Sequence, residues 1–216
     1  MTECIIGVRF KTFTLLAGDT SAGRSIVVMK QDHDKLMKLG DQTGMMLCGE
    51  AGDCIYFGEF IQKNINLYKI RHGYSLNPHS TANWTRNQLA RYLRKSPFMV
   101  NMIIGGYDTE KKEAKLYFMD YLASLVEVPY AAHGYSSFFI LSIFDRLYRE
   151  DMDQKAAVEL LMQCIAELQK RFLINFPGFT YYVIDENGFS DCHTIDPEEV
   201  KKMAERVAEE GATMEA

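Results

Sequence analysis

Residues 4–23 read CIIGVRFKTFTLLAGDTSAG and contain two short apolar runs separated by one lysine. The runs, residues 4–10 and 12–17, are rich in β-branched and aromatic side chains, which favour strands. The segment GDTSAG follows directly and supplies turn-forming residues. This stretch therefore predicts two paired strands at the start of the chain.

The rest of the chain alternates between short β-prone runs and longer helical patterns. Strands are expected at residues 25–30 and 45–48, in a hairpin over residues 98–123 around the turn DTEKKE, and in a hairpin over residues 180–195 with Asn187-Gly188 at its turn. Apolar side chains at helical spacing predict helices over about 53–72, 80–94, 135–148, 154–172 and from 197 onward. Trp84, Leu89, Tyr92 and Leu93 are expected to face inward from the second helix.

The order of these elements predicts one α+β domain over residues 1–216, built of stacked antiparallel sheets with helices outside. Gly73 is a natural C-cap for the first helix. Asp196, Pro197 and Glu199 fit the N-cap, first-turn and capping-box positions of the last helix. That helix is expected to end in a flexible tail at about residues 209–216.

Composition is that of an ordinary globular protein. The chain has 216 residues, of which 47% are hydrophobic and 25% charged. The formal net charge is −5 and the basic residues are scattered, so we expect no nucleic acid among the partners. No apolar run is long enough to span a bilayer and the first eleven residues lack the pattern of a secretion signal, so we expect no membrane association.

The cysteines are odd in number, lack any CxxC spacing and lie in apolar surroundings: Cys4, Cys48, Cys54, Cys164 and Cys192. This usage favours reduced, packed thiols in an intracellular protein over a disulfide framework.

Six phrases, spread in order over essentially the whole chain, resemble the beta subunits of the 20S proteasome. They are LLAGDTSAG, HDKLMKL, MLCGEAGD, NMIIGGYD, LYFMDYLA and YAAHGYSSFFILSIFDRLY. That family has the fold of N-terminal nucleophile hydrolases, so the resemblance implies a four-layer αββα sandwich of two antiparallel β-sheets flanked by helices. Residues 49–76, 83–94, 131–138 and 157–177 look specifically like a non-catalytic class within the family, at the fourth position of the beta ring.

The resemblance also identifies the family's catalytic positions in this chain. Active members expose an N-terminal threonine, followed by an aspartate, a lysine and a glycine whose amide serves as the oxyanion hole. Asp19, Lys35 and Gly49 match the last three, and all give one register, which puts Glu3 at the nucleophile position. Thr2 is one residue out of step, and such a shift in a strand moves a side chain by ~3.3 Å to the opposite face. The resemblance therefore implies no catalytic residue here and a vestigial framework of Asp19, Lys35 and Gly49.

A second departure lies around the position of the threonine amine. Active members carry an aspartate and a serine after the fourth helix and a serine near the start of the third, where this chain has Phe172, Asn175 and Tyr135. An aromatic ring does not hold an ammonium or relay a proton as a carboxylate does. The alternative that stays open is an active threonine endopeptidase, since a free N-terminal Thr2 would carry both a nucleophilic hydroxyl and a basic amine.

The other candidate metal ligands in the sequence are not expected to surround one ion. Asp32, His33 and Asp34 are adjacent, so their side chains point to opposite faces of an extended stretch, and a solvated turn is the better interpretation. His133 precedes Gly134, and we expect it to pack or cap at the third helix. The remaining histidines, His72, His79 and His193, show no ligand spacing. We expect neither a metal nor a cofactor.

The resemblance implies a structural role in ATP- and ubiquitin-linked protein degradation. The expected partners are other alpha and beta subunits in a barrel of twenty-eight subunits, located in the cytoplasm and nucleus. Two further hypotheses stay open: the threonine protease that uses Thr2, and an unrelated α+β binding protein.

Overall fold

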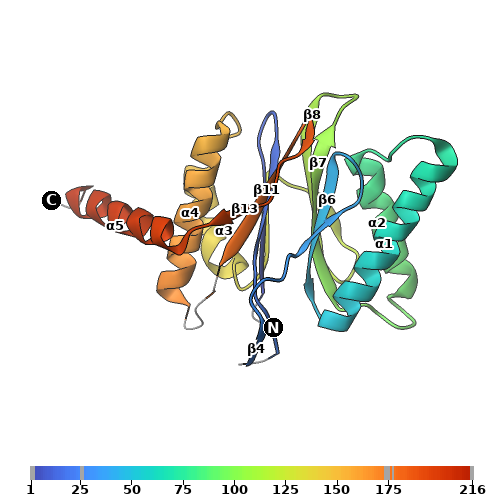
Figure 1. Ribbon diagram of the computed structural model, residues 1–216, viewed down its shortest axis with the longest axis horizontal. Coiled ribbons are helices and arrows are strands. Elements are labelled where there is room, and N and C mark those ends of the chain that lie inside the picture. Colours follow the sequence, from blue (N-terminus) through green and yellow to red (C-terminus); the bar gives the residue numbers. More distant parts are fainter. Residues whose placement is uncertain (1–2, 25–26, 173–175, 177, 215–216) are drawn as a thin grey trace.

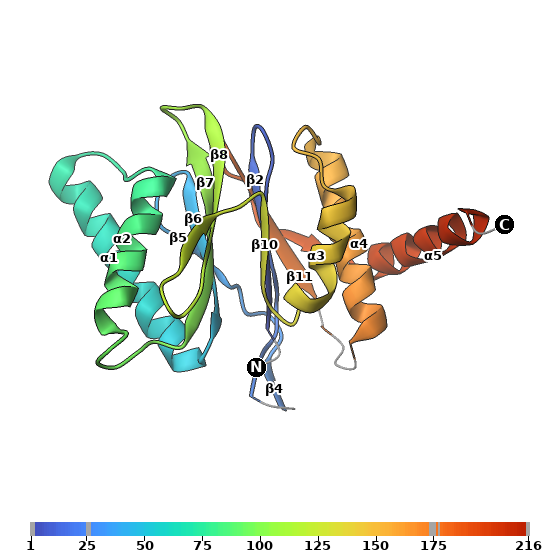
Figure 2. The same cartoon turned by 180° about the vertical axis from the view of Figure 1, so that it is seen from behind.

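The structure, a computed structural model, describes residues 3–24, 27–172, 176 and 178–214. Figure 1 shows four layers, in which the helices α1 (Ala51–His72) and α2 (Pro78–Tyr92) cover one sheet, and α3 (Ser137–Leu147) and α4 (Gln154–Arg171) cover the other. The last helix, α5 (Pro197–Met214), starts beside α4 and extends away from the sandwich (Figure 2). The predicted α+β sandwich is confirmed.

The first sheet contains both strands predicted at the start of the chain. Its order is β10-β1-β2-β11-β12, with β13 also paired to β11, and every pair is antiparallel. The strands are β1 (Cys4–Arg9), β2 (Thr14–Asp19), β10 (Tyr130–Gly134), β11 (Phe179–Asp185), β12 (Gly188–Phe189) and β13 (His193–Ile195). Because Phe179 of β11 lies opposite Asp19, the end of β2 is enclosed in the sheet.

The second sheet has the antiparallel order β5-β6-β7-β8-β9. Its strands are β5 (Leu36–Lys38), β6 (Thr43–Gly49), β7 (Val100–Asp108), β8 (Glu113–Met119) and β9 (Leu125–Glu127). A separate two-stranded ribbon of β3 (Ala22–Arg24) and β4 (Val27–Lys30) protrudes beside the N-terminus (Figure 1).

Apolar side chains fill all three gaps between the layers. Strand alternation puts Cys4, Ile6 and Val8 against the core beneath α3 and α4, and Ile5 in the core between the two sheets. The helices α1 and α2 cover the other face of the second sheet through a third cluster that includes Phe57. Each fully buried large side chain contributes about 1.5–3 kcal/mol relative to leaving it exposed.

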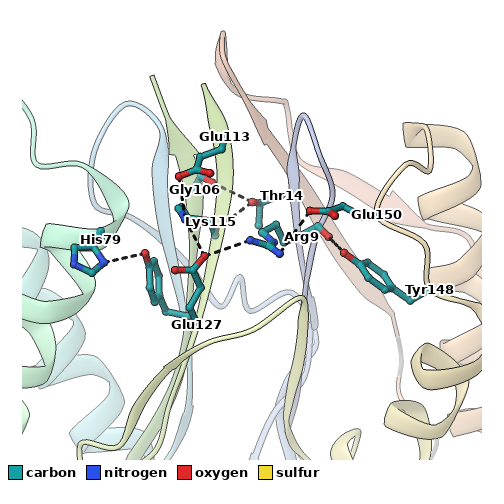
Figure 3. Close-up of polar contacts among 10 residues, drawn as sticks. Arg9, Thr14, His79, Gly106, Glu113, Lys115, Glu127, Tyr148 and Glu150 are labelled. Carbon is teal, nitrogen blue, oxygen red and sulfur yellow. Dashed lines mark hydrogen bonds and ion pairs between the residues drawn. The ribbon is translucent and has the colours of Figure 1, made fainter. Parts of the chain in front are cut away.

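Polar contacts also join the two sheets at the end far from the N-terminus (Figure 3). The buried Thr14 hydroxyl of β2 lies 3.0 Å from the carbonyl oxygen of Gly106 and 3.2 Å from that of Lys115. Nearby, the Arg9 guanidinium of β1 donates to Glu127 of β9 at 3.3 Å, and Glu127 also accepts from Lys115 at 2.9 Å. Charged groups from both sheets therefore meet at this edge.

Capping residues mark the end of α1 and the start of α5. Gly73 has φ 78° and caps α1, as predicted, with its N–H donating to Lys69. Asp196 accepts a hydrogen bond from the Glu198 amide at the start of α5, which supports its predicted capping role.

Several predicted boundaries and burials differ. The helix α2 begins at Pro78, two residues earlier than expected, because Asn77 caps it and proline suits a first helical position. Tyr92 was predicted to face inward but is 38% exposed, since it lies at the end of α2 and contacts Phe98 edge-on. The strands β3, β5, β9 and β10 were not predicted. Helix α5 continues to Met214, so most of the tail expected at 209–216 is helical. Its flexibility stays a prediction, and residues 215–216 lie outside the described residues.

Candidate functional site

Two of the framework residues predicted from the sequence form a buried ion pair. Asp19 ends β2 and Lys35 precedes β5, and their side chains approach to 3.1 Å between Lys35 Nζ and Asp19 Oδ2. They are only 1% and 6% exposed. Lys35 Nζ also donates hydrogen bonds to the carbonyl oxygens of Asp19 at 2.9 Å and Ser21 at 2.7 Å, in addition to the ion pair.

The Asp19 carboxylate is equally well satisfied. Its Oδ1 accepts from the Cys4 amide at 2.7 Å, and its Oδ2 accepts from both the amide and the hydroxyl of Ser21. A buried ion pair is stable only when such additional hydrogen bonds offset the loss of hydration. The pair therefore holds the first residue of β1 to the turn that follows β2.

Glu3 lies where the register from the sequence puts the nucleophile of active relatives. Its carboxylate oxygen Oε2 accepts from the Gly49 amide at 3.0 Å, and its backbone oxygen accepts from the Tyr135 amide at 3.3 Å. Burial raises the pKa of the Glu3 carboxyl above its ordinary value, while the hydrogen bond from Gly49 and the charge of Lys35 lower it. Gly49 of β6 thus binds the Glu3 carboxylate, and Lys35, directly before β5, adds a positive charge.

Gly49 ends β6 in a conformation reserved for glycine. Its φ is 149°, and a Cβ added there would lie 2.1 Å from the Met99 carbonyl oxygen. The following residue, Glu50, donates its amide to that same oxygen. The backbone of this turn thereby directs the Gly49 N–H toward Glu3 of the opposite sheet.

Three thiols at the N-terminal end of the sandwich, those of Cys4, Cys48 and Cys54, are protonated at neutral pH. Burial raises the pKa of Cys4 and of Cys54 to about 12, and it raises the pKa of Cys48 further, with the negative charges of Asp19 or Glu3 adding to the effect. Because the thiolate is the nucleophile, these side chains pack as small apolar groups. The five cysteines of the chain are free thiols, but Cys192 is exposed and not packed as the sequence predicted.

Two of the three departures predicted from the sequence, Tyr135 and Phe172, are aromatic residues that pack together. The rings of Tyr135 and Phe172 lie 4.7 Å apart, and Phe172 also stacks on Phe176 at 5.5 Å. Asn175, the third departure identified in the sequence, and Thr2 lie outside the described residues.

The other candidates from the sequence do not form a site together. Asp34 accepts from the Tyr182 hydroxyl at 2.5 Å, whereas Asp32 is exposed and pairs with Lys30. His133 packs against Phe118 of the opposite sheet, not at α3 as a cap, and burial lowers its pKa to about 4. Within the described part of the chain, no group of three or more His, Cys, Asp or Glu is placed to hold a metal ion.

None of the helices in the described ranges combines the length and apolar character needed to cross a bilayer.

Residues 2–184 match the family model described as Proteasome subunit. The chain belongs to the proteasome subunit family. Beta subunits of the proteasome form a threonine protease family, and its members assemble with other alpha and beta subunits into the core particle.

Relatives from fungi and plants identify this proteasome subunit as a beta subunit. A probable proteasome subunit beta type-4 of Schizosaccharomyces pombe is 45% identical over 192 residues, which cover 88% of this chain and 99% of the relative. Proteasome subunit beta type-4 of Saccharomyces cerevisiae is 41% identical over 86% of this chain and 94% of its own. Proteasome subunit beta type-2-A of Arabidopsis thaliana is 42% identical over 88% and 92%. The resemblance found in the sequence is confirmed.

Sequence reasoning missed the partners that hold this proteasome site together. Ser21 lies in the turn phrase that carried the resemblance, but nothing in its spacing indicated a hydrogen bond to Asp19. The contact between Glu3 and Gly49 joins residues 46 positions apart in different sheets. Only the packing of the two sheets brings such residues together.

Proposed function

We propose that this chain is a non-catalytic beta subunit, which helps to form the beta ring and the proteolytic chamber of the 20S proteasome core. The observation that carries the proposal is the hydrogen bond from the Gly49 amide to the Glu3 carboxylate. An acyl-transfer enzyme uses a preorganised amide of this kind to bind the developing oxyanion. In this chain the amide already donates to an anion, and that anion is not a nucleophile for peptide bonds.

The surroundings of Glu3 support the same proposal. A nucleophilic threonine needs a basic amine held by polar neighbours. Here Tyr135, whose backbone amide donates to the Glu3 carbonyl oxygen, packs its ring against Phe172. The Lys35 ammonium is buried, pairs with the Asp19 carboxylate and donates to the carbonyl oxygens of Asp19 and Ser21. Asp19, Lys35 and Gly49 are thus assigned a structural role, as a framework that holds β1 and β6 in place.

The assembly implied by the resemblance completes the proposal. We place the chain at the fourth position of the beta ring, between two beta neighbours and against the alpha ring and the opposing beta ring, in a barrel of twenty-eight subunits. It would serve ATP- and ubiquitin-linked protein degradation in the cytoplasm and nucleus. The beta type-4 and beta type-2 names of the relatives support this position.

An electrophilic probe that reacts with N-terminal threonines tests the absence of catalysis. Core particles containing this chain are treated with the probe and the labelled subunits are identified by mass spectrometry. We expect label on other beta subunits, which serve as the internal positive control, and none on this chain. Label on this chain that a Thr2→Ala substitution removes would establish the alternative, a threonine endopeptidase.

Affinity capture of the chain from a native lysate tests the assembly. We expect alpha and beta subunits to co-purify, and the chain to elute in size-exclusion chromatography with the core particle. Elution at the mass of a single chain, without other subunits, would instead support an unrelated α+β protein.

A further inference from the structure

A cleft of about 300 Å³ lies at the end of the sandwich far from the N-terminus, where segments of both sheets and the start of α4 meet (Figure 1). Phe13 comes from the turn between β1 and β2, Tyr107 from the end of β7, Asp153 from the start of α4, and Asp185 and Glu186 from the end of β11 and the turn after it. A cleft of this volume can hold a side chain or a small molecule. It lies at the opposite end of β1 from the site described above.

The cleft is strongly acidic. Asp153, Asp185 and Glu186 contribute carboxylates, and none of the described residues that line it is basic. Two of these carboxylates use one oxygen locally, since Asp153 accepts from the Ala156 amide at 2.8 Å and Asp185 from the Asn187 amide at 2.7 Å. Glu186 is exposed and lies in the turn. Each of the three carboxylates therefore has at least one oxygen left for a ligand.

The Tyr107 hydroxyl also points to a ligand. Tyr107 is 7% exposed and faces the first sheet, as does Gly105 two residues before it, whose added Cβ would approach Thr14. Its hydroxyl makes no hydrogen bond to the described part of the chain, although buried polar groups ordinarily have a partner. Burial and the negative charges of Glu186 and Asp185 raise the pKa of this phenol, so it is protonated at neutral pH. An unpartnered phenol thus lies beside carboxylates in the wall of the cleft.

The spacing of these groups suits an organic cation better than a metal ion. Among the residues that the structure describes, no three His, Cys, Asp or Glu side chains are placed to hold a metal. A guanidinium is planar, carries five N–H donors and packs on aromatic rings. It can therefore reach carboxylates on separate segments while contacting Phe13 and Tyr107. An ammonium is compact and more strongly hydrated, so it would satisfy fewer of these acceptors.

We propose that this cleft binds a guanidinium group, supplied by an arginine side chain of a protein partner. The carboxylates of Asp185 and Glu186 accept its hydrogen bonds, and Phe13 and Tyr107 form the apolar wall. A protein is the source that we propose because the chain belongs to a family whose members assemble with other subunits.

NMR of ¹⁹F on the full chain labelled with 3-fluorotyrosine tests binding, and Tyr107→Phe assigns the Tyr107 signal. The probe is N-acetyl-arginine amide, which presents the side chain as a polypeptide does. We expect a saturable shift of the Tyr107 signal. The citrulline analogue, of nearly the same shape but uncharged, is expected to give none, and the lysine analogue is expected to bind more weakly. Free L-arginine is expected to bind no more tightly than the blocked probe.

Removing charges inside and outside the cleft separates a site from general attraction. Glu186→Gln and Asp185→Asn are each expected to weaken binding of the arginine probe by about 10-fold, the effect of one charge-assisted hydrogen bond. Asp185→Asn keeps a side-chain oxygen for the Asn187 amide. The matched control is Asp151→Asn, which removes an exposed carboxylate two residues before Asp153 and outside the cleft. It is expected to change binding by less than about 2-fold, because solvent and salt screen its charge.

Three results would overturn the guanidinium site. They are the absence of a saturable Tyr107 shift with the arginine probe, an equal shift with the citrulline analogue, and equal losses in Glu186→Gln and Asp151→Asn. Tighter binding of free L-arginine than of the blocked probe would overturn the protein partner. If Asp185→Asn does not fold, Glu186→Gln, at an exposed position, carries the same comparison.

Discussion

Gly49 and Gly73 are both left-handed glycines, but the space around them differs. Gly73, with φ 78°, ends α1 in a region that other residues enter at modest cost, and a Cβ there would meet nothing within 4 Å. Gly49, with φ 149°, lies in a region almost closed to other residues, and its added Cβ would be 2.1 Å from the Met99 oxygen. Glycine is thus favoured at position 73, whereas position 49 requires it.

Replacing Gly49 by alanine is expected to lower the free energy of unfolding by about 3 kcal/mol or more, because a strained φ adds to a backbone collision. Gly73→Ala is the matched control, with an expected loss of about 1 kcal/mol. Urea unfolding of the two variants measures the difference. Equal losses would show that the turn at Gly49 relaxes without cost.

His133 makes stability depend on pH. It is 7% exposed and stacked on Phe118, and burial lowers its pKa from 6.5 to about 4. Between these values the unfolded chain binds a proton that the folded chain does not, so the free energy of unfolding falls as the pH is lowered through this window, by about 3 kcal/mol in total. His133→Gln is expected to flatten this part of the pH dependence.

Thermal unfolding between pH 4 and 7 measures the effect of His133. The control is His72→Gln, at the exposed end of α1, which is expected to keep the parent slope. An unchanged slope in His133→Gln would assign the acid sensitivity to other groups.

At the scale of elements, the ends of helices follow short signals in the sequence. Gly73 and Asp196 were identified as caps from their residue type and position, and both act as caps in the structure. Asn77 was missed because the expected helix began later, although Asn-Pro is itself a start signal. The strands β9 and β10 were missed because each is short and because Pro129, which lies between them, interrupts the run of strand-forming residues. Their existence depends on the neighbours β8 and β1 that pair with them.

The helix α4 offers the cleanest test of a cap. Asp153 accepts from the Ala156 amide at 2.8 Å, which satisfies one of the free N–H groups of the first turn. Asp153→Ala is expected to lower the free energy of unfolding by about 1 kcal/mol. Asp151→Ala, two residues earlier and exposed, removes the same charge without the cap and is expected to stay within about 0.5 kcal/mol of the parent. A loss of equal size in both variants would indicate a charge effect instead of capping.

At the scale of the whole molecule, strand β1 contacts the second sheet at both of its ends. Glu3 lies directly before its first residue and accepts from Gly49 of β6, and Arg9, its last residue, donates to Glu127 of β9 (Figure 3). The two contacts differ in environment, because burial raises the pKa of the Glu3 carboxyl whereas the Arg9 and Glu127 side chains are 24% and 38% exposed. We expect the first contact to be insensitive to salt and the second to be screened.

A double-mutant cycle with Arg9→Met and Glu127→Gln measures the coupling across the sheets. An exposed or half-exposed pair contributes about 0.2–1 kcal/mol, and we expect a coupling in that range at low ionic strength that decreases in 1 M salt. Glu113→Gln with Arg9→Met is the control cycle, since Glu113 pairs with Lys115 of its own sheet. A coupling that does not respond to salt would indicate that packing, and not charge, joins the sheets at this edge.

The sequence by itself predicted an α+β sandwich and its alternation between groups of strands and pairs of helices, because periodicity, caps and turn residues are local properties. The membership in the proteasome subunit family came from the resemblance of its phrases, and the same resemblance identified Glu3, Asp19, Lys35 and Gly49 as positions to examine. Only the tertiary structure decided what these residues touch: the buried ion pair of Asp19 and Lys35, the Gly49 amide directed at Glu3, and the location of His133 between the sheets. Those contacts join residues far apart in the chain, and they form only when the two sheets pack face to face.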